Sequence, residues 1–253
     1  MKKIINFGCS FAVGNSVPCF MPGLKSGAYI HSNLDLRLKA EKKYNIKIGR
    51  PTNCGKIIAD KLQLNYEMIA ENGASNEMIF RKLLQAELKD SFVLIGLTSY
   101  NRREALTTLI ENDGTRRWHT WKMMEPDAPA RYKELPFNMW NKKFTPAIEE
   151  DGQIRSVIQI LYMQSYLQSK NIPYLMYNSL YNGFDVPLTE ECRKLLCMVD
   201  QKKYYKLQGS SHETQHGWCL KNKLVVSELD EHPRIDGQTA WAEKLMPLME
   251  KIS

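Results

Sequence analysis

The sequence predicts an α/β domain built on a mainly parallel β-sheet. Short apolar segments that are typical of buried strands alternate with segments whose apolar residues recur at helical spacing. The segment Phe92–Leu97 (FVLIGL) is apolar throughout, as expected of a central parallel strand that is buried on both faces. Small and polar residues follow three predicted strands, at Gly8–Ser10, Asn72–Asn76 and Gly96–Asn101. Parallel α/β sheets have their sites at these strand ends.

Size and composition are those of a globular protein, and we take 1–253 as a single domain. The 253 residues suffice for one well-cored domain with a large insertion or for two small ones, and 43% are hydrophobic and 25% charged. The net charge of +7 comes from scattered Lys and Arg without a helix-turn-helix, zinc-finger or RNP pattern, so no specific nucleic-acid partner is expected. The six cysteines form no C-x-x-C pair, which favours reduced thiols. The oligomeric state stays open.

The first half of the chain is predicted to contain three strands and two helices. Apolar and β-branched runs that end at glycine or polar residues indicate strands at Lys3–Phe7, Leu64–Ala70 and Phe92–Leu97. Helical spacing of apolar residues predicts helices at Asn53–Leu62 and from the N-cap region Ser75-Asn76 to about Leu88.

The alternation stops between about 104 and 151. This stretch is too long for an ordinary connection, so we expect an irregular insertion or lid. Its tryptophans, Trp118 and Trp121 among them, could stack on a sugar or form a small secondary core. Asn101 and Arg102, which follow the third strand, are further candidates for substrate binding.

Regular elements return after the insertion. We expect a helix at Ile154–Gln168, a strand at Pro173–Asn178 and a helix at Thr189–Asp200. A polar, irregular segment then covers Gln201–Asn222, and a helix runs from about Gln238 to Lys251.

The N-terminal residues superficially resemble a lipoprotein signal. Lys2-Lys3 precede a short apolar run and Cys9, but only about six residues separate them, whereas a signal needs roughly 7–15 apolar residues. No later run approaches the roughly 20 apolar residues of a membrane span. We therefore expect no signal peptide, no transmembrane segment and no membrane partner.

Two separated segments contain residues suited to nucleophilic catalysis. A serine hydroxyl attacks a carbonyl when a base takes its proton, a third group orients the base, and donors hold the oxyanion. Ser10 follows a glycine at the end of the first strand, and Asp230 and His232 lie just before the last predicted helix. Taken separately, each of the two segments is better explained as a surface loop.

Together, these segments resemble the SGNH (GDSL-type) hydrolase superfamily. Gly8-Cys9-Ser10 matches its first block, Gly73 in ENGASNEMI its second, and His232 in DEHPRIDGQTAWAEKL its last. These three blocks are most similar to those of phage- and bacteria-borne members, which read GCSFxxG, GxSN and DxHPxxxGxxxWA. The resemblance implies a three-layer, flavodoxin-like fold with Ser10 as nucleophile, His232 as base and Asp230 as its orienter. It also places the N–H groups of Ser10 and Gly73 in the oxyanion hole.

The chain departs from the family pattern at three places. Cys9 stands where the family has an aspartate, and Asp230 lies two residues before His232 instead of three. Thr98 replaces the asparagine of the oxyanion hole, where its hydroxyl, or the amide of Asn76 or Asn101, could donate. Loss of one oxyanion donor typically costs about 10²–10³ in rate, so weak or lost activity is an alternative outcome.

The resemblance implies a serine esterase or acyl hydrolase that needs no metal or organic cofactor. Its substrate would be a small ester, such as an O-acetyl group on a glycan. The alternative is a non-catalytic phage virion or accessory protein that binds a glycan or a partner protein on the same fold. The expected location is accordingly the cytoplasm or a virion.

Two further hypotheses concern metal and thiol chemistry. HETQH (His212–His216) fits the H-E-x-x-H pattern of zinc peptidases, which requires both histidines on one helix. Neighbouring GSS and GW leave little room for that helix, and no third ligand is evident, so a polar loop at the rim of the site is favoured. Cys9 could be the nucleophile in place of Ser10, but we favour the interpretation that Cys9 is a small buried residue of the core.

Overall fold

The structure is a computed structural model of the 253-residue chain. It describes residues 1–13, 52–71, 73–110, 116–122, 145–186, 188–225 and 231–252. At residue 13 and over 103–110, 116–122 and 145–149 the description covers the backbone and not the side chains.

The centre of the fold is a five-stranded parallel sheet, which confirms the predicted fold class. Its strands lie in the order β2-β1-β3-β6-β7. Their bounds are β1 Lys3–Gly8, β2 Asn65–Ala70, β3 Ser91–Leu97, β6 Tyr174–Asn178 and β7 Tyr204–Tyr205. This order is that of a flavodoxin-like, doubly wound sheet, whose first and third strands flank the point where the strand order reverses.

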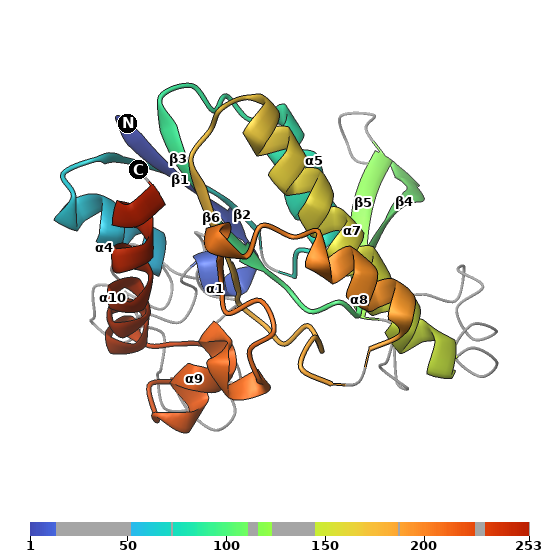
Figure 1. The fold of residues 1–253 in the computed structure, drawn as a ribbon. Coiled ribbons are helices and arrows are strands. Elements are labelled where there is room, and N and C mark those ends of the chain that lie inside the picture. Colours follow the sequence, from blue (N-terminus) through green and yellow to red (C-terminus); the bar gives the residue numbers. More distant parts are fainter. Residues whose placement is uncertain are drawn as a thin grey trace, which may run out of the picture.

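Helices connect these strands and cover both faces of the sheet. They are α1 Ser10–Val13, α4 Cys54–Lys61, α5 Asn76–Gln85, α7 Thr145–Ser169, α8 Glu190–Cys197, α9 Gln215–Lys221 and α10 Ile235–Ile252, with 3₁₀ turns η2 Gln201–Lys203 and η3 Ser211–Glu213. Figure 1 shows α4 and α10 on one face and α5, α7 and α8 on the other, which gives three layers. The short helix α1 lies at the carboxyl end of β1.

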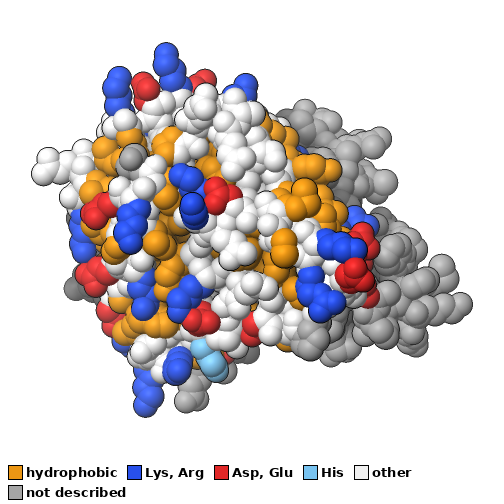
Figure 2. Space-filling model, in the orientation of Figure 1, with side chains coloured by type: hydrophobic (Ala, Val, Ile, Leu, Met, Phe, Trp, Pro, Cys, Tyr) orange, Lys and Arg blue, Asp and Glu red, His pale blue; other side chains and the backbone are white. Residues whose placement is uncertain are grey.

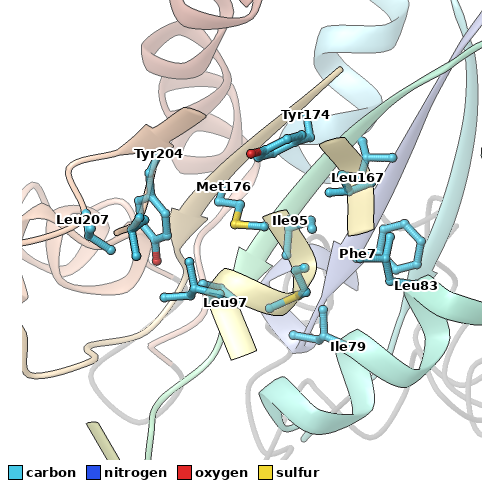
Figure 3. Packing of buried hydrophobic residues seen from close by; sticks show 14 of the residues in the cluster. Phe7, Ile79, Leu83, Ile95, Leu97, Leu167, Tyr174, Met176, Tyr204 and Leu207 are labelled. Atoms are coloured by element: carbon cyan, nitrogen blue, oxygen red, sulfur yellow. The ribbon is translucent and has the colours of Figure 1, made fainter. Parts of the chain in front are cut away.

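Each face of the sheet has its own hydrophobic core. Ile4 of β1 belongs to the cluster that includes Trp241 and Leu245 of α10, whereas Ile5 and Phe7 belong to the cluster under α5, α7 and α8. The alternation follows from the two-residue period of a strand. Figure 3 shows the second cluster, in which side chains of β1, β3 and β6 meet those of the covering helices.

Side-chain caps fix the starts of α4 and α5. The Asn53 side chain accepts a hydrogen bond from the Lys56 N–H at 2.9 Å, and Ser75 accepts one from the Met78 N–H at 3.1 Å. Such caps satisfy backbone donors that the first helical turn leaves unpaired. The predicted helix starts are confirmed, whereas α5 ends at Gln85 instead of near Leu88.

The predicted irregularity of 104–151 is wrong in part. β4 (Arg102–Ile110) and β5 (Arg116–Lys122) form a separate two-stranded antiparallel sheet, and α7 begins at Thr145 instead of 154. Threonine and isoleucine favour the strand state of β4, and the intervening sequence includes Asp113-Gly114, a dipeptide common between paired strands. Pro146 is compatible with the first turn of α7.

Two other predicted boundaries also need correction. The segment expected to be irregular over Gln201–Asn222 contains β7, η3 and α9, because β7 pairs with β6 and Thr214 caps α9 by accepting from the Gly217 N–H at 3.1 Å. The last helix begins at Ile235, three residues before the predicted Gln238. None of the helices in the described ranges has the length and apolarity of a membrane span.

Charges of both signs are mixed over the surface drawn in Figure 2. Several lysines pair with carboxylates, as Lys3 does with Glu67 at 2.9 Å and Lys194 with Glu190 at 2.7 Å. On this face the positive side chains are therefore interspersed with negative ones and form no continuous basic stripe.

Candidate active site

Ser10 lies in a tight turn directly after β1. Gly8 ends the strand, Cys9 is fully buried, and Ser10 begins α1, where the Ala12 N–H donates to the Cys9 carbonyl at 2.9 Å. Gly8 has no room for a side chain, because a Cβ there would lie 2.6 Å from Ala12 Cβ. Glycine therefore lets the chain fold back sharply and bring Ser10 to the carboxyl end of the sheet.

His232 reaches Ser10 from the segment before α10. Its Nε2 lies 2.9 Å from Ser10 Oγ, a hydrogen-bond distance between residues 222 positions apart. With the ring proton on Nδ1, the serine hydroxyl donates to Nε2, as proton transfer to a general base requires. The ring of Phe11, next to Ser10, stacks on the His232 ring with centroids 5.0 Å apart. The structure thus brings together the two residues that the sequence singled out at separate positions.

The third member predicted from the sequence, Asp230, lies outside the described residues, so its contact with His232 stays a prediction. Its neighbour Glu231 is described, and its carboxylate faces another histidine. Glu231 Oε2 accepts from His216 Nε2 at 2.7 Å. Glu231 is therefore engaged with His216.

Gly73 lies in the exposed turn after β2. Its φ of +75° is in the left-handed region, which glycine adopts without steric cost. The turn is closed by the Ala74 N–H, which donates to the Glu71 carbonyl at 3.2 Å. The role of the Gly73 N–H in an oxyanion hole stays a prediction.

Thr98 and Asn76 interact closely after β3. Asn76 Nδ2 donates to the Thr98 carbonyl at 3.2 Å, and the Thr98 N–H donates to Asn76 Oδ1 at 2.9 Å. Both side chains are buried, and the Thr98 hydroxyl has no hydrogen-bond partner among the described residues. The Asn76 amide, considered from the sequence as an oxyanion donor, thus binds the backbone of Thr98.

The four candidate substrate-binding residues lie around β4 and β5. Arg102, the first residue of β4, donates through Nη1 to the Ala74 carbonyl at 3.5 Å, so it contacts the turn that contains Gly73. Asn101 directly precedes it and is half-buried. Trp118 and Trp121 belong to β5, where only the backbone is described, so their roles stay predictions.

HETQH does not form the continuous helix that a zinc peptidase requires. His212 lies in η3 and His216 in α9, and between them Thr214 has an extended backbone with ψ of 161°. Glu213 accepts from the Ser210 N–H and pairs with Lys206. Within the described ranges, no group of His, Cys, Asp and Glu side chains could hold a metal ion.

A buried glutamine near the site has a role that the sequence analysis missed. Gln238 Nε2 donates to the Phe11 carbonyl at 3.1 Å, and its Oε1 accepts from the Cys54 N–H at 3.0 Å and from Gln215 Nε2 at 2.9 Å. It thereby ties the turn after Ser10 to α4, α9 and α10. The only sequence signal was its place in the DEHPRIDGQTAWAEKL segment.

No protein-family model and no curated protein sequence matches the chain. Among solved structures, a lipase from a goat rumen metagenome is 15% identical with a TM-score of 0.45, over 98% of this chain and 97% of that one. A GDSL-like lipase from Bacteroides thetaiotaomicron is 9% identical with a TM-score of 0.39, over 99% and 88%. An acetyl xylan esterase from Butyrivibrio proteoclasticus is 14% identical with a TM-score of 0.45, over 99% and 63%.

Proposed function

We propose that the chain is an SGNH-type serine hydrolase of ester bonds, with Ser10 as nucleophile and His232 as base. The main support is the 2.9 Å distance between Ser10 Oγ and His232 Nε2 at the carboxyl end of a parallel sheet. The alternative nucleophile Cys9 is fully buried, whereas Ser10 retains 8% exposure. Together with the order of the sequence blocks, this geometry favours attack by the serine.

The proposed reaction has two halves. Ser10 Oγ attacks the acyl carbonyl while its proton passes to His232 Nε2, and His232 then gives that proton to the departing alcohol oxygen. A water next attacks the acyl-enzyme, loses a proton to His232, and releases the acid as the proton returns to Ser10. Asp230 would accept from the Nδ1–H of His232 and stabilise its charged form.

The oxyanion would be held by the N–H groups of Ser10 and Gly73 and by the Thr98 hydroxyl. A buried hydroxyl without a partner costs about 1–3 kcal/mol, so a substrate oxygen that accepts from Thr98 would remove an existing penalty. Asn76, which binds both backbone groups of Thr98, would hold this residue in place instead of touching the substrate.

The proposed substrate is a small ester, and the narrower assignment is an O-acetyl group on a glycan. Arg102, which contacts the Gly73 turn, is one candidate for contact with the sugar; Asn101, Trp118 and Trp121 are the others. Acetate release from acetylated xylan, compared with release from p-nitrophenyl acetate, tests this assignment. Hydrolysis of p-nitrophenyl acetate without acetate release from xylan would contradict the assignment of a glycan substrate.

The decisive experiment is labelling by a fluorophosphonate probe, combined with p-nitrophenyl acetate hydrolysis. We expect labelling at Ser10, and both signals should be lost in Ser10→Ala and His232→Ala. Ser169→Ala, which removes an exposed hydroxyl at the end of α7, is the matched control and should retain both. Hydrolysis by Ser10→Ala at the wild-type rate would contradict the proposal. A folded wild-type protein that neither labels nor hydrolyses would favour the non-catalytic binding protein.

A further inference from the structure

A second histidine–carboxylate pair lies beside the proposed dyad and has no part in the proposed chemistry. His216 Nε2 donates to Glu231 Oε2 at 2.7 Å, and Glu231 directly precedes His232 in the chain. The side chains are 27% and 48% exposed, respectively. The pair therefore lies at the rim of the site, where a substitution leaves no large cavity.

The His232 segment is fixed on both sides of the imidazole. On one side, Glu231 is held by His216. On the other, Pro233 forms an antiparallel bridge with Val225, and the Arg234 N–H donates to the Leu224 carbonyl at 2.8 Å. Removing the Glu231 contact would take away the anchor that the structure describes on the N-terminal side of His232.

His216 is itself anchored to the central sheet. Its backbone N–H donates at 3.0 Å to the carbonyl of Ser179, the residue that follows β6. The preceding residue, Gln215, is fully buried and bonds Gln238 at 2.9 Å. The start of α9 is therefore a fixed support, from which the His216 side chain reaches the His232 segment.

An aromatic contact joins the same histidine to the nucleophile turn. The Phe11 ring lies edge-on to His216, with centroids 5.5 Å apart, and stacks on His232 at 5.0 Å. Phe11 directly follows Ser10, and Gln238 holds its carbonyl. Hence His216 contacts both sides of the Ser10–His232 hydrogen bond, through Phe11 on one side and Glu231 on the other.

We propose that His216 is a positioning residue that sets the distance between Ser10 and His232 through Glu231 and Phe11. The kinetic part of this inference rests on the proposed function, whereas the position of His232 can be measured without activity. The role also gives HETQH a purpose other than metal binding: its last histidine supports the base.

The first measurement is the ¹H NMR signal of the His232 ring, assigned by comparison with His232→Gln. Stacking on Phe11 should shift this signal upfield in the wild type. Glu231→Leu should return it toward the value of an exposed histidine, and Glu231→Gln, whose amide oxygen still accepts from His216, should preserve it. Glu243→Gln is the matched control, because it alters an exposed pair with Lys61 (3.2 Å) between α10 and α4.

The second measurement is the rate of fluorophosphonate labelling and of ester hydrolysis. A displacement of about 1 Å costs on the order of 100-fold in rate, so Glu231→Leu and His216→Leu should lower kcat by about 10–100-fold with KM nearly unchanged. Glu231→Gln and Glu243→Gln should keep most of the wild-type kcat. Thermal unfolding identifies a variant that has lost its fold.

The two proposals fail in different ways. A folded Glu231→Leu variant whose His232 signal stays at the wild-type position would overturn the positioning role, whether or not the wild type is active. An active wild type whose Glu231→Leu and His216→Leu variants label at the wild-type rate would overturn it as well. A wild type that does not label would contradict the hydrolase alone, because the NMR comparison still tests how His232 is held.

Discussion

Gly8 at the end of β1 pairs in register with Gly96 near the end of β3, and neither position has room for a side chain. A Cβ on Gly8 would lie 2.9 Å from the Gly96 carbonyl oxygen, and one on Gly96 would meet Ser179 Oγ. The two strands flank the point where the strand order reverses, so this glycine pair lies next to the turn that contains Ser10.

Gly8→Ala should therefore displace the turn that contains Ser10. Because the added methyl group meets Ala12 and the β3 backbone, we expect a loss of about 1–3 kcal/mol in the free energy of unfolding. The labelling rate of Ser10 should fall as well. Urea unfolding and fluorophosphonate labelling measure the two effects, and a variant as stable and reactive as wild type would contradict the close approach.

Asn76→Ala should reduce both stability and reactivity. It leaves the Thr98 N–H and carbonyl without their partner, at a cost of about 1–3 kcal/mol for each buried group. Ser75→Ala is the matched control, since it removes only the helix cap of α5, at about 1 kcal/mol. Equal labelling rates in the two variants would argue against a positioning role for Asn76.

Thr98→Val should separate stability from activity. The hydroxyl is buried without a partner among the described residues, so replacing it by a methyl group of similar size should leave stability unchanged or raise it. If the hydroxyl holds the oxyanion, kcat should fall by about 10²–10³, and Thr98→Ser should restore most of it. A Thr98→Val enzyme with wild-type kcat would remove the hydroxyl from the oxyanion hole.

The cysteines should differ sharply in their reactivity toward Ellman's reagent. Burial raises the pKa of the Cys54 thiol to about 11 and that of Cys219 to about 12, whereas Cys197 is exposed. The thiolate is the reactive form, so Cys54 and Cys219 should react at pH 8 only after unfolding. Cys197→Ser should remove one rapidly reacting thiol, and Cys54→Ser should leave the rapid phase unchanged. A rapid phase that shrinks in Cys54→Ser would contradict its burial.

Asp236 should make stability depend on pH. The hydrogen bond from Arg234 lowers the pKa of this carboxyl, so the folded protein favours its charged form. The pair is half-exposed, and Asp236→Asn should cost about 0.5–1 kcal/mol at pH 7. The stabilisation is present above the unfolded-state pKa and disappears as pH falls through the lowered folded-state value. Urea unfolding of the wild type and of Asp236→Asn at pH 7 and near pH 3 measures this effect. An equal difference in stability between the two proteins at both pH values would contradict it.

The sequence predicted the parts of the fold that depend on local pattern. The apolar run of β3 and the side-chain caps at Asn53 and Ser75 each determine a local structure, and the corresponding elements are confirmed. The pairing of Ser10 with His232 came from the order of short sequence blocks. Asp230, which lies outside the described residues, stays a prediction.

The missed features depend on contacts between distant segments. β7 has only two residues and exists because it pairs with β6, and Asn76 binds Thr98 across 22 positions. The contact of His216 with Glu231 likewise joins α9 to a segment 15 residues further on. No periodicity marks such contacts, so the sequence led us to consider Asn76 as a donor to substrate and to place His216 in a polar loop.

The separation of 222 residues between Ser10 and His232 also determines when the dyad can form during synthesis. At roughly 5–20 residues per second, the ribosome needs about 10–45 s to proceed from the serine to the histidine. Throughout that interval the nascent chain contains Ser10 without His232. The Ser10–His232 hydrogen bond therefore forms late, when the C-terminal part of the chain docks on the sheet and closes a loop that spans almost the whole chain.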